Sequence, residues 1–230
     1  MITRRIVTAR FPARWLLAAL AAAVAVACSV NPVTGERELR IYGEDWEQQV
    51  GGQMYAPMKQ SQGGEFVLDP ALTAYVQDVG ERLAAHAKRK DAFDFEFSVL
   101  NDSTPNAWAL PGGKIAVNRG LLTELNNEAE LAAVLGHEVG HVTARHAVRQ
   151  QTGATAAGVG AMVVGILTGS GDLANVAGMA GNALISGYGR DMELEADELG
   201  AEYLNRIGFE PEAMIDVVRL LKNQEMLEIQ

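Results

Sequence analysis

The chain has 230 residues, of which 29 are acidic and 19 are basic, so its formal charge is −10 at pH 7. A surface this acidic argues against nucleic acid and anionic lipid headgroups as binding partners. A single cysteine excludes an intramolecular disulfide, so the fold must rest on its core and on any metal that it binds.

Residues 1–27 have the pattern of a signal peptide. Four arginines precede an apolar run of 13 residues from Trp15 to Ala27, which is shorter than the roughly 20 residues that a spanning helix needs. The run ends in small residues before Cys28, as at a bacterial lipoprotein processing site, so Cys28 is the predicted lipidation site. Plain secretion, with Cys28 unpaired or removed, is the alternative.

Lipidation at Cys28 would attach the protein to a membrane that its acidic surface does not attract. Cleavage there removes four of the 19 basic residues, which changes the formal charge from −10 to −14. Ser29 occupies the position where Asp retains many Gram-negative lipoproteins in the inner membrane. We therefore expect a lipid-anchored protein on the periplasmic face of the outer membrane.

The remaining residues, about 200, suit one catalytic domain. We expect an N-terminal lead-in over residues 28–64 and the main domain over residues 65–230. Within the lead-in, Gln48–Gly64 contains four glycines and is expected to be partly helical and partly loose.

Asp69 and Pro70 predict a helix start, with a cap residue and then proline in the first turn, and the helix should run to about Lys90. Its inward-facing residues would be Leu72, Val76, Val79 and Leu83. Apolar and polar residues then alternate from Phe93 to Val99, which predicts a half-buried strand.

Residues 106–118 predict a hairpin. Asn106–Leu110 leads into Pro111-Gly112-Gly113, which turns the chain back into Lys114–Asn118. Together with the helices on either side, this predicts an α+β fold that is mainly helical, with a small sheet next to the helix described next.

The run His137-Glu138-Val139-Gly140-His141 carries most of the functional information. Asn127 and Glu130 resemble a capping box, and apolar residues follow at helical spacing. Two histidines four apart share one helix face and can hold one Zn²⁺, while Glu138 lies beside the open position and can take a proton from water. This predicts metal-assisted hydrolysis, most often of a peptide bond; a chance pair of histidines on an exposed helix is the alternative.

A further helix from Arg190 to Leu204 supplies the acidic residues. Glu193 and Asp197 are four apart and share a face, so one carboxylate can bind the metal while the other accepts the spare N–H of a ligating histidine. Glu195 points nearly the opposite way, and we expect Glu195 and Glu198 to form a solvated face.

A three-histidine metal set is excluded by counting. It needs a Gly three residues after His141 and a His three further on, where the chain has Ala144 and Ala147. On a continuing helix, His146 would lie about 140° from His141 and face away from it. His146 and His86 are therefore predicted to be surface or packing residues.

The segment from Thr152 to Gly189 is rich in Gly and Ala, and Asp172 is its only charged residue before Gly189. We expect a pair of buried helices that pack closely through small residues. A mobile cover over the active site is the alternative, because the segment links the two ligand-bearing helices.

These motifs, in this order, resemble the zinc metallopeptidases related to HtpX, the CAAX prenyl protease and the periplasmic proteases BepA and LoiP. The likeness covers about Asn31 to Glu212, and Asn31–Gly35 is similar to the start of the mature region in lipoprotein members. It implies a zincin-like domain with one Zn²⁺ per chain.

The resemblance also implies roles for individual residues. His137, His141 and Glu193 would bind zinc, Glu138 would be the general base, and Asp197 would orient a ligand. The edge strand with Asn106, Ala107, Trp108 and Ala109 would pair with extended substrate, in agreement with the general ability of strand edges to bind peptides. For Trp108, an ordinary core position is an equal alternative.

Two points stay open. Tyr188, Arg190 and Tyr203 are unranked candidates for stabilising the oxyanion, because no histidine follows His146. The helix opened by Pro211 is still amphipathic at Gln230, and no repeat of about 34 residues appears, so the chain is either a compact protein or one that stops before a partner-binding half.

We therefore predict a zinc endopeptidase that acts on unfolded or misassembled envelope proteins, with the outer-membrane assembly machinery as a possible partner and no role for nucleic acid. A chaperone-like module, which binds unfolded outer-membrane proteins while proteolysis stays latent, is the main alternative. A purely structural metal site is disfavoured because such sites normally have four protein ligands.

Overall fold

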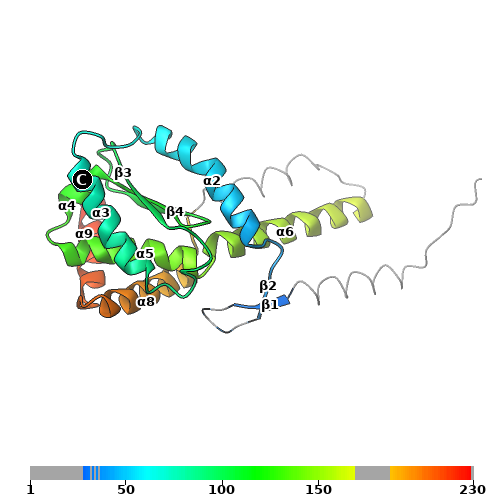
Figure 1. Ribbon diagram of the computed structural model, residues 1–230. Coiled ribbons are helices and arrows are strands. Elements are labelled where there is room, and N and C mark those ends of the chain that lie inside the picture. Colours follow the sequence, from blue (N-terminus) through cyan, green and yellow to red (C-terminus); the bar gives the residue numbers. More distant parts are fainter. Residues whose placement is uncertain (1–27, 32, 34, 36, 169–186, 229–230) are drawn as a thin grey trace, which may run out of the picture.

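The computed structural model describes residues 28–31, 33, 35, 37–168 and 187–228. Helices dominate and surround one small sheet (Figure 1), which confirms the predicted α+β class. In chain order the elements are β1 Cys28–Val30, β2 Arg37–Leu39, α2 Glu44–Ser61, α3 Pro70–Ala84, β3 Glu96–Leu100, β4 Ala107–Leu110, β5 Lys114–Asn118, α4 Arg119–Glu124, α5 Glu128–Thr143, α6 His146–Thr168, α8 Arg190–Arg206 and α9 Ala213–Glu228.

The main sheet has the strand order β3-β5-β4. β3 is parallel to β5, and β4 is antiparallel to it, with Trp108 opposite Ala116. Gly112 and Gly113 have φ values of +77° and +81° in the turn between β4 and β5, a conformation that glycine adopts without steric cost. The predicted hairpin is confirmed, and β4 lies at an edge of the sheet.

Helices cover both faces of this sheet. On one face, Phe97 of β3 packs against Gly80 of α3. Ser98, which follows Phe97 in β3, points to the other face. Its side-chain oxygen accepts a hydrogen bond from the hydroxyl of Tyr55 in α2 over 2.8 Å. The predicted strand is therefore present, but it begins at Glu96 rather than Phe93 and is more buried than expected, because α2 covers the face that carries Ser98.

The helix α2 also corrects the expectation for Gln48–Gly64, which is helical without interruption as far as Ser61. A Cβ atom on Gly51 would lie 1.8 Å from the carbonyl oxygen of Pro111, so only glycine lets α2 approach the turn of the hairpin. The glycine that suggested a loose segment serves close packing instead.

The start of α3 is as predicted, because the Asp69 carboxylate accepts hydrogen bonds from the backbone N–H groups of Ala71 and Leu72. Such a cap contributes about 1 kcal/mol. The helix ends at Ala84 rather than near Lys90. After it the chain turns inward, where the buried Arg89 guanidinium donates to the carboxylate of Glu47. This long-range ion pair overrides local helix propensity.

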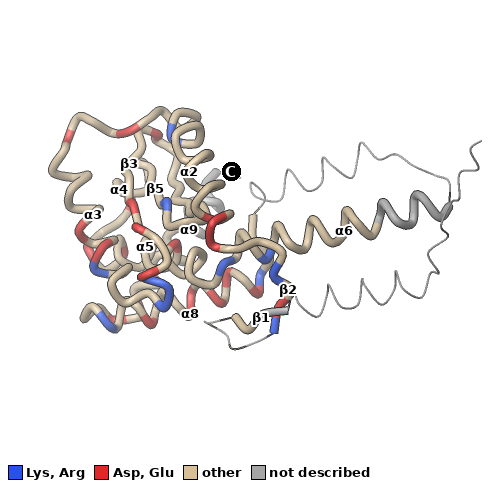
Figure 2. The backbone as a smooth tube through the Cα atoms, turned by 45° about the vertical axis from the view of Figure 1, so that its right-hand side comes forward, with Lys and Arg blue, Asp and Glu red and all other residues tan. Residues whose placement is uncertain are grey.

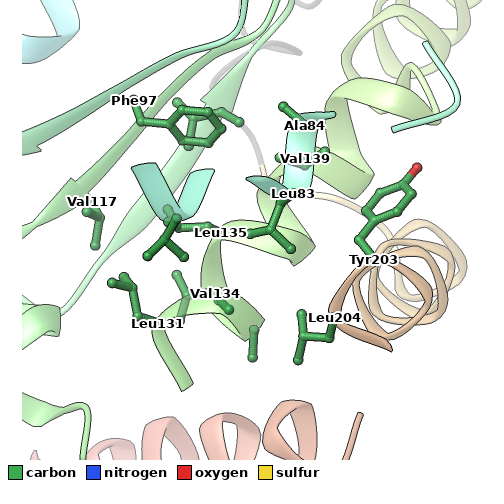
Figure 3. Close-up of a cluster of buried hydrophobic side chains, with 14 of the residues drawn as sticks. Leu83, Ala84, Phe97, Val117, Leu131, Val134, Leu135, Val139, Tyr203 and Leu204 are labelled. Atoms are coloured by element: carbon green, nitrogen blue, oxygen red, sulfur yellow. The ribbon is translucent and has the colours of Figure 1, made fainter. Parts of the chain in front are cut away.

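The helix α5 passes through the centre of the core. Figure 3 shows Leu135 of α5 among Leu83 of α3, Phe97 of β3 and Leu204 of α8, all of them buried. Truncating a buried leucine such as Leu135 to alanine typically costs about 2–5 kcal/mol. The core therefore fixes the helix that carries the two motif histidines.

Small residues let α8 pack directly on α5. A Cβ on Gly140 would lie 2.8 Å from the carbonyl oxygen of Ala196, and one on Gly200 would lie 3.0 Å from the backbone nitrogen of His137. Contacts this short leave no room for side chains between the two helices. The two acidic positions of α8 are thereby brought up to the histidine face of α5.

The helix α6 continues to Thr168 and projects from the body of the molecule (Figure 1). Residues 150–168 carry no charge in the sequence, and the part of this stretch that Figure 2 draws as described has no blue or red segment. Val159 is 55 % exposed and most of residues 153–160 are at least partly exposed, so the predicted burial is wrong for these residues. The rest of the predicted helix pair, residues 169–186, lies outside the described residues.

Near the N-terminus, β1 and β2 form an antiparallel hairpin in which Cys28 lies opposite Leu39. The signal peptide predicted over residues 1–27 lies outside the described residues, and lipidation of Cys28 stays a prediction. At the other end, Pro211 precedes α9 as expected. None of the helices in the described part of the chain combines the length and the apolar character that crossing a membrane requires.

Candidate metal centre

The helix α5 begins at the predicted cap. The Asn127 side-chain oxygen accepts a hydrogen bond from the Glu130 backbone N–H over 3.0 Å, while the Glu130 carboxylate accepts from the backbone N–H of Asn126 over 2.8 Å. Two of the N–H groups at this end are thereby satisfied. One turn separates His137 from His141, and their Nε2 atoms lie 2.9 Å apart.

Glu193 of α8 completes a three-residue cluster. Its carboxylate oxygens lie 3.4 Å from Nε2 of His137 and 3.8 Å from Nε2 of His141. A tetrahedral Zn²⁺ with nitrogen and oxygen ligands at about 2.0–2.1 Å would hold these atoms about 3.3–3.4 Å apart. The donor types suit zinc, and the three separations of 2.9, 3.4 and 3.8 Å bracket this value. The structure thus brings together the three residues that the sequence predicted as ligands.

Asp197 lies one turn of α8 beyond Glu193, and its carboxylate is 2.8 Å from Nδ1 of His137. Since a carboxylate only accepts, Nδ1 of His137 is the donor and its Nε2 faces the cluster. Burial lowers the pKa of His137, but the hydrogen bonds to Asp197 and Glu193 outweigh burial and raise the pKa. The cluster thus favours positive charge at this position.

His146 does not face away from His141, so this prediction is wrong. The Nδ1 atoms of the two residues are 2.7 Å apart, and the His146 side chain is 0 % exposed. The helix α5 ends at Thr143, and Arg145 has φ +62°, a left-handed conformation that turns the chain back before α6 begins. A count along one continuous helix could not detect this reversal.

Glu195 is likewise not on a solvated face. Its carboxylate lies 3.3 Å from Nε2 of His146 and 2.5 Å from a guanidinium nitrogen of Arg149. Burial lowers the pKa of His146 to about 4 although Glu195 opposes the effect, and burial together with His137 and His146 lowers the pKa of His141. Glu198 is exposed, as expected.

A buried carboxylate holds the turn between α5 and α6. Glu47 of α2 is 1 % exposed, and it accepts hydrogen bonds from Arg145 and from Arg89. Arg145 also donates to the carbonyl oxygen of Tyr42. Because both arginines are buried, water does not reach their charges, and the Glu47 carboxylate stabilises them instead. The residues come from three separate segments, and no sequence motif announced the cluster.

Glu138 follows the first histidine and lines a groove of about 400 Å³ that also contains His137, His141 and Glu193. Burial raises the pKa of Glu138 to about 7, while nearby His137 opposes the rise. A carboxylate with a pKa near neutrality can both accept and return a proton.

The predicted substrate strand forms one wall of this groove. Asn106, Ala107, Trp108 and Ala109 all line it. Because β4 pairs only with β5 among the described residues, its other edge is open for pairing. Trp108 is partly buried, lines the groove and makes an edge contact with Tyr55 at 6.0 Å between ring centroids, while its role in substrate binding stays a prediction.

A second cavity, of about 270 Å³, adjoins the groove at the start of β4. Its far wall is apolar and belongs to α9, whose Val218 and Leu221 stay partly exposed although the helix packs on the core. His137 and Glu138 border both cavities. The sequence marked α9 as amphipathic, but not as part of the site.

The three residues considered for stabilising the oxyanion lie in different surroundings. Tyr203 is fully buried in the core, and Arg190 is exposed at the start of α8. Tyr188 stacks on His141 with 4.3 Å between ring centroids and lines the groove. The described end of the segment from Thr152 to Gly189 therefore reaches the site.

Comparisons with known proteins agree with this geometry. Residues 70–228 match the model of peptidase family M48. The chain is 36 % identical over 167 residues to the beta-barrel assembly-enhancing protease of Yersinia pestis and 35 % identical over 166 residues to that of Escherichia coli K12. These alignments cover 69 % and 68 % of the chain, but it spans only 34 % of either relative.

A eukaryotic relative is similar over a longer part of the chain. The mitochondrial metalloendopeptidase OMA1 of Schizosaccharomyces pombe is 30 % identical over 184 residues, which cover 79 % of the chain and 54 % of that protein.

Proposed function

The chain belongs to peptidase family M48, and on that premise we propose that it is a zinc-dependent endopeptidase acting on unfolded or misassembled proteins of a bacterial envelope. The observation that carries this proposal is the placement of His137, His141 and Glu193, which offer three ligand atoms within 4.8 Å of one another at the wall of an open groove. Three protein ligands leave one position for substrate or water.

Each residue of the site has a proposed task. Zn²⁺, when bound by these three side chains, supplies positive charge that polarises a carbonyl group and makes water more acidic. Glu138 takes the proton of the attacking water and later delivers it to the leaving amine nitrogen. Asp197 orients His137, and Tyr188 is the candidate that stabilises the developing oxyanion.

The groove suits an extended polypeptide. A substrate strand adds to the open edge of β4 through main-chain hydrogen bonds, which recognise any sequence that is unfolded. The adjoining cavity receives one side chain of the substrate, and the apolar wall of α9 favours an apolar one. We therefore propose Asn106 to Ala109 as the substrate-binding strand and α9 as a source of side-chain preference.

The cellular setting is proposed from the N-terminus and from the relatives. The names of the two bacterial relatives state that they enhance β-barrel assembly. Together with a lipid on Cys28, this supports quality control of outer-membrane proteins at the periplasmic face of the outer membrane. Growth with a labelled fatty acid should label the wild-type protein and not Cys28→Ser, and an unlabelled wild type would contradict the anchor.

Zinc content and cleavage of an unfolded β-barrel protein test the proposed activity. We expect one zinc per chain, cleavage that a chelator abolishes, and recovery when zinc is restored. Glu138→Gln should keep zinc and substrate binding but lower kcat by about 10²–10⁴-fold. Glu198→Gln, on the exposed side of α8, is the matched control.

The same variants distinguish the chaperone-like alternative. If Glu138→Gln retains the full cellular effect of the protein, holding clients rather than cutting them is its function. A folded protein without stoichiometric zinc would overturn the proposed enzyme.

A further inference from the structure

We infer that His146 is a positioning residue that fixes the tautomer and the ring orientation of the zinc ligand His141. The inference rests on the proposed function, since it concerns the same metal centre. His146 is a buried histidine that counting along the helix had placed away from the site and that has no part in the roles described above.

The position of the proton on the His141 ring determines which of its nitrogens can bind a metal. Its Nε2 faces Nε2 of His137 at 2.9 Å and the Glu193 carboxylate at 3.8 Å. A neutral imidazole has one donor and one acceptor nitrogen, so binding a cation through Nε2 requires the proton to be on Nδ1. That N–H needs an acceptor, and Nδ1 of His146 lies 2.7 Å away.

His146 is itself held by a carboxylate on α8. If its Nδ1 accepts, its proton must be on Nε2, and the Glu195 carboxylate lies 3.3 Å from that atom. Arg149 in turn binds Glu195. The hydrogen bonds therefore run in one direction, from His141 to His146 to Glu195, and an ion pair ends the series.

The chain reversal at Arg145 and a neighbouring tyrosine hold the two histidine rings in place. The left-handed conformation of Arg145 brings His146 back over His141, and Glu47 binds the Arg145 side chain in a buried ion pair. Tyr188 stacks on a face of the His141 ring, with 22° between the ring planes, and its ring also lies 5.7 Å from that of His146. The ring of His141 is thus fixed by one hydrogen bond and by stacking, as metal-ligating histidines generally require.

Nitrogen NMR of the zinc-loaded protein tests the inference without any substitution. The chain has four histidines, so a tag-free sample gives few signals to assign. We expect His141 to carry its proton on Nδ1 and His146 to carry its proton on Nε2, with Nδ1 of His146 unprotonated. A proton on Nδ1 of His146, or zinc on Nδ1 of His141, would overturn the inference.

Two substitutions test the consequence for zinc. His146→Leu removes the acceptor and should weaken zinc binding about 10–100-fold in competition with a chelator. His146→Asn places a side-chain oxygen near the position of Nδ1 and should restore most of the affinity. His86→Leu makes the same chemical change at an exposed histidine and should leave zinc affinity unchanged.

A purely structural role for His146 predicts a different pattern. It would lower the stability of the metal-free protein in both variants while the zinc dissociation constant stays that of the wild type, and this result overturns the inference. Should His146→Leu fail to fold, the NMR experiment on the wild type still decides. Loss of zinc binding or cleavage in the wild type would instead refute the proposed function, so the two failures are distinguishable.

Discussion

The two proposed histidine ligands are supported in different ways. His137 donates to Asp197, a half-exposed carboxylate one helical turn from Glu193. His141 lies against His146, which is fully buried and reaches the ligand only because the chain reverses at Arg145. One support follows from helix periodicity within α8, and the other is built from segments that are far apart in the sequence.

The difference shows how charge is distributed around the centre. Glu138, Glu193 and Asp197 already place three carboxylates near the histidines, so a fourth in direct contact with His141 would add repulsion. The second support is instead an uncharged imidazole, and the carboxylate behind it is neutralised by Arg149. His137 is therefore supported by a charged carboxylate that solvent can reach. His141 is supported by a buried imidazole that carries no charge.

The largest effect is expected from breaking the buried side. Glu47→Ala leaves Arg89 and Arg145 buried without their shared carboxylate, which should lower the free energy of unfolding by about 3–5 kcal/mol. Urea denaturation measures it. Glu44→Ala removes a carboxylate that is 50 % exposed and also pairs with Arg89, and it should cost at most about 1 kcal/mol. Equal losses in the two variants would contradict the proposed anchoring.

Removing zinc should affect the two sides unequally. At a free concentration 100 times its dissociation constant, zinc stabilises the folded protein by about 2.7 kcal/mol, which a chelator would remove. Hydrogen exchange should then accelerate at the start of α8, near Glu193, more than at Thr143–Arg145, where the Glu47 cluster remains intact. Uniform acceleration would show that the two sides form one cooperative unit.

Asp197→Ala separates metal binding from stability. Loss of the acceptor for His137 should weaken zinc binding about 10–100-fold. Because Asp197 is 38 % exposed, loss of its contact with His137 should lower the free energy of unfolding of the metal-free protein by at most about 1 kcal/mol. Chelator competition and urea denaturation measure the two quantities, and a larger loss of stability in the metal-free protein would contradict the comparison.

The smallest effects compare two glutamates of α8. Glu195→Gln keeps an oxygen that can accept from His146 but loses the ion pair with Arg149, and should cost about 1 kcal/mol. Glu198→Gln should change stability by less than about 0.5 kcal/mol because the residue is exposed. Identical thermal unfolding of the two variants would restore the interpretation of Glu195 as a solvated residue.

Much of the site was predictable because its spacing is helical. His137, Glu138 and His141 lie within one turn or so, and Glu193 and Asp197 are likewise four residues apart, so each set occupies one face. The capped start of α5 and the hairpin that ends in β4 also followed from local signals. In these cases the residues that determine the geometry are neighbours in the chain.

The predictions that were wrong share a physical cause. The end of α3, the continuous α2 and the position of His146 all depend on contacts between distant segments, such as those of Glu47 with Arg89 and Arg145. Burial makes these ion pairs strong enough to override local preference. Nothing within a few residues of Arg145 indicates that it takes a left-handed conformation.

Local sequence was enough to identify the proposed ligands, their order and the helices that carry them, since a period of 3.6 residues places side chains without reference to the rest of the fold. The packing of α8 on α5 through Gly140 and Gly200, and the place of α9 beside the neighbouring cavity, became evident from the folded chain alone. Close packing and buried charge are properties of the assembled chain, because both depend on which distant surfaces exclude water together.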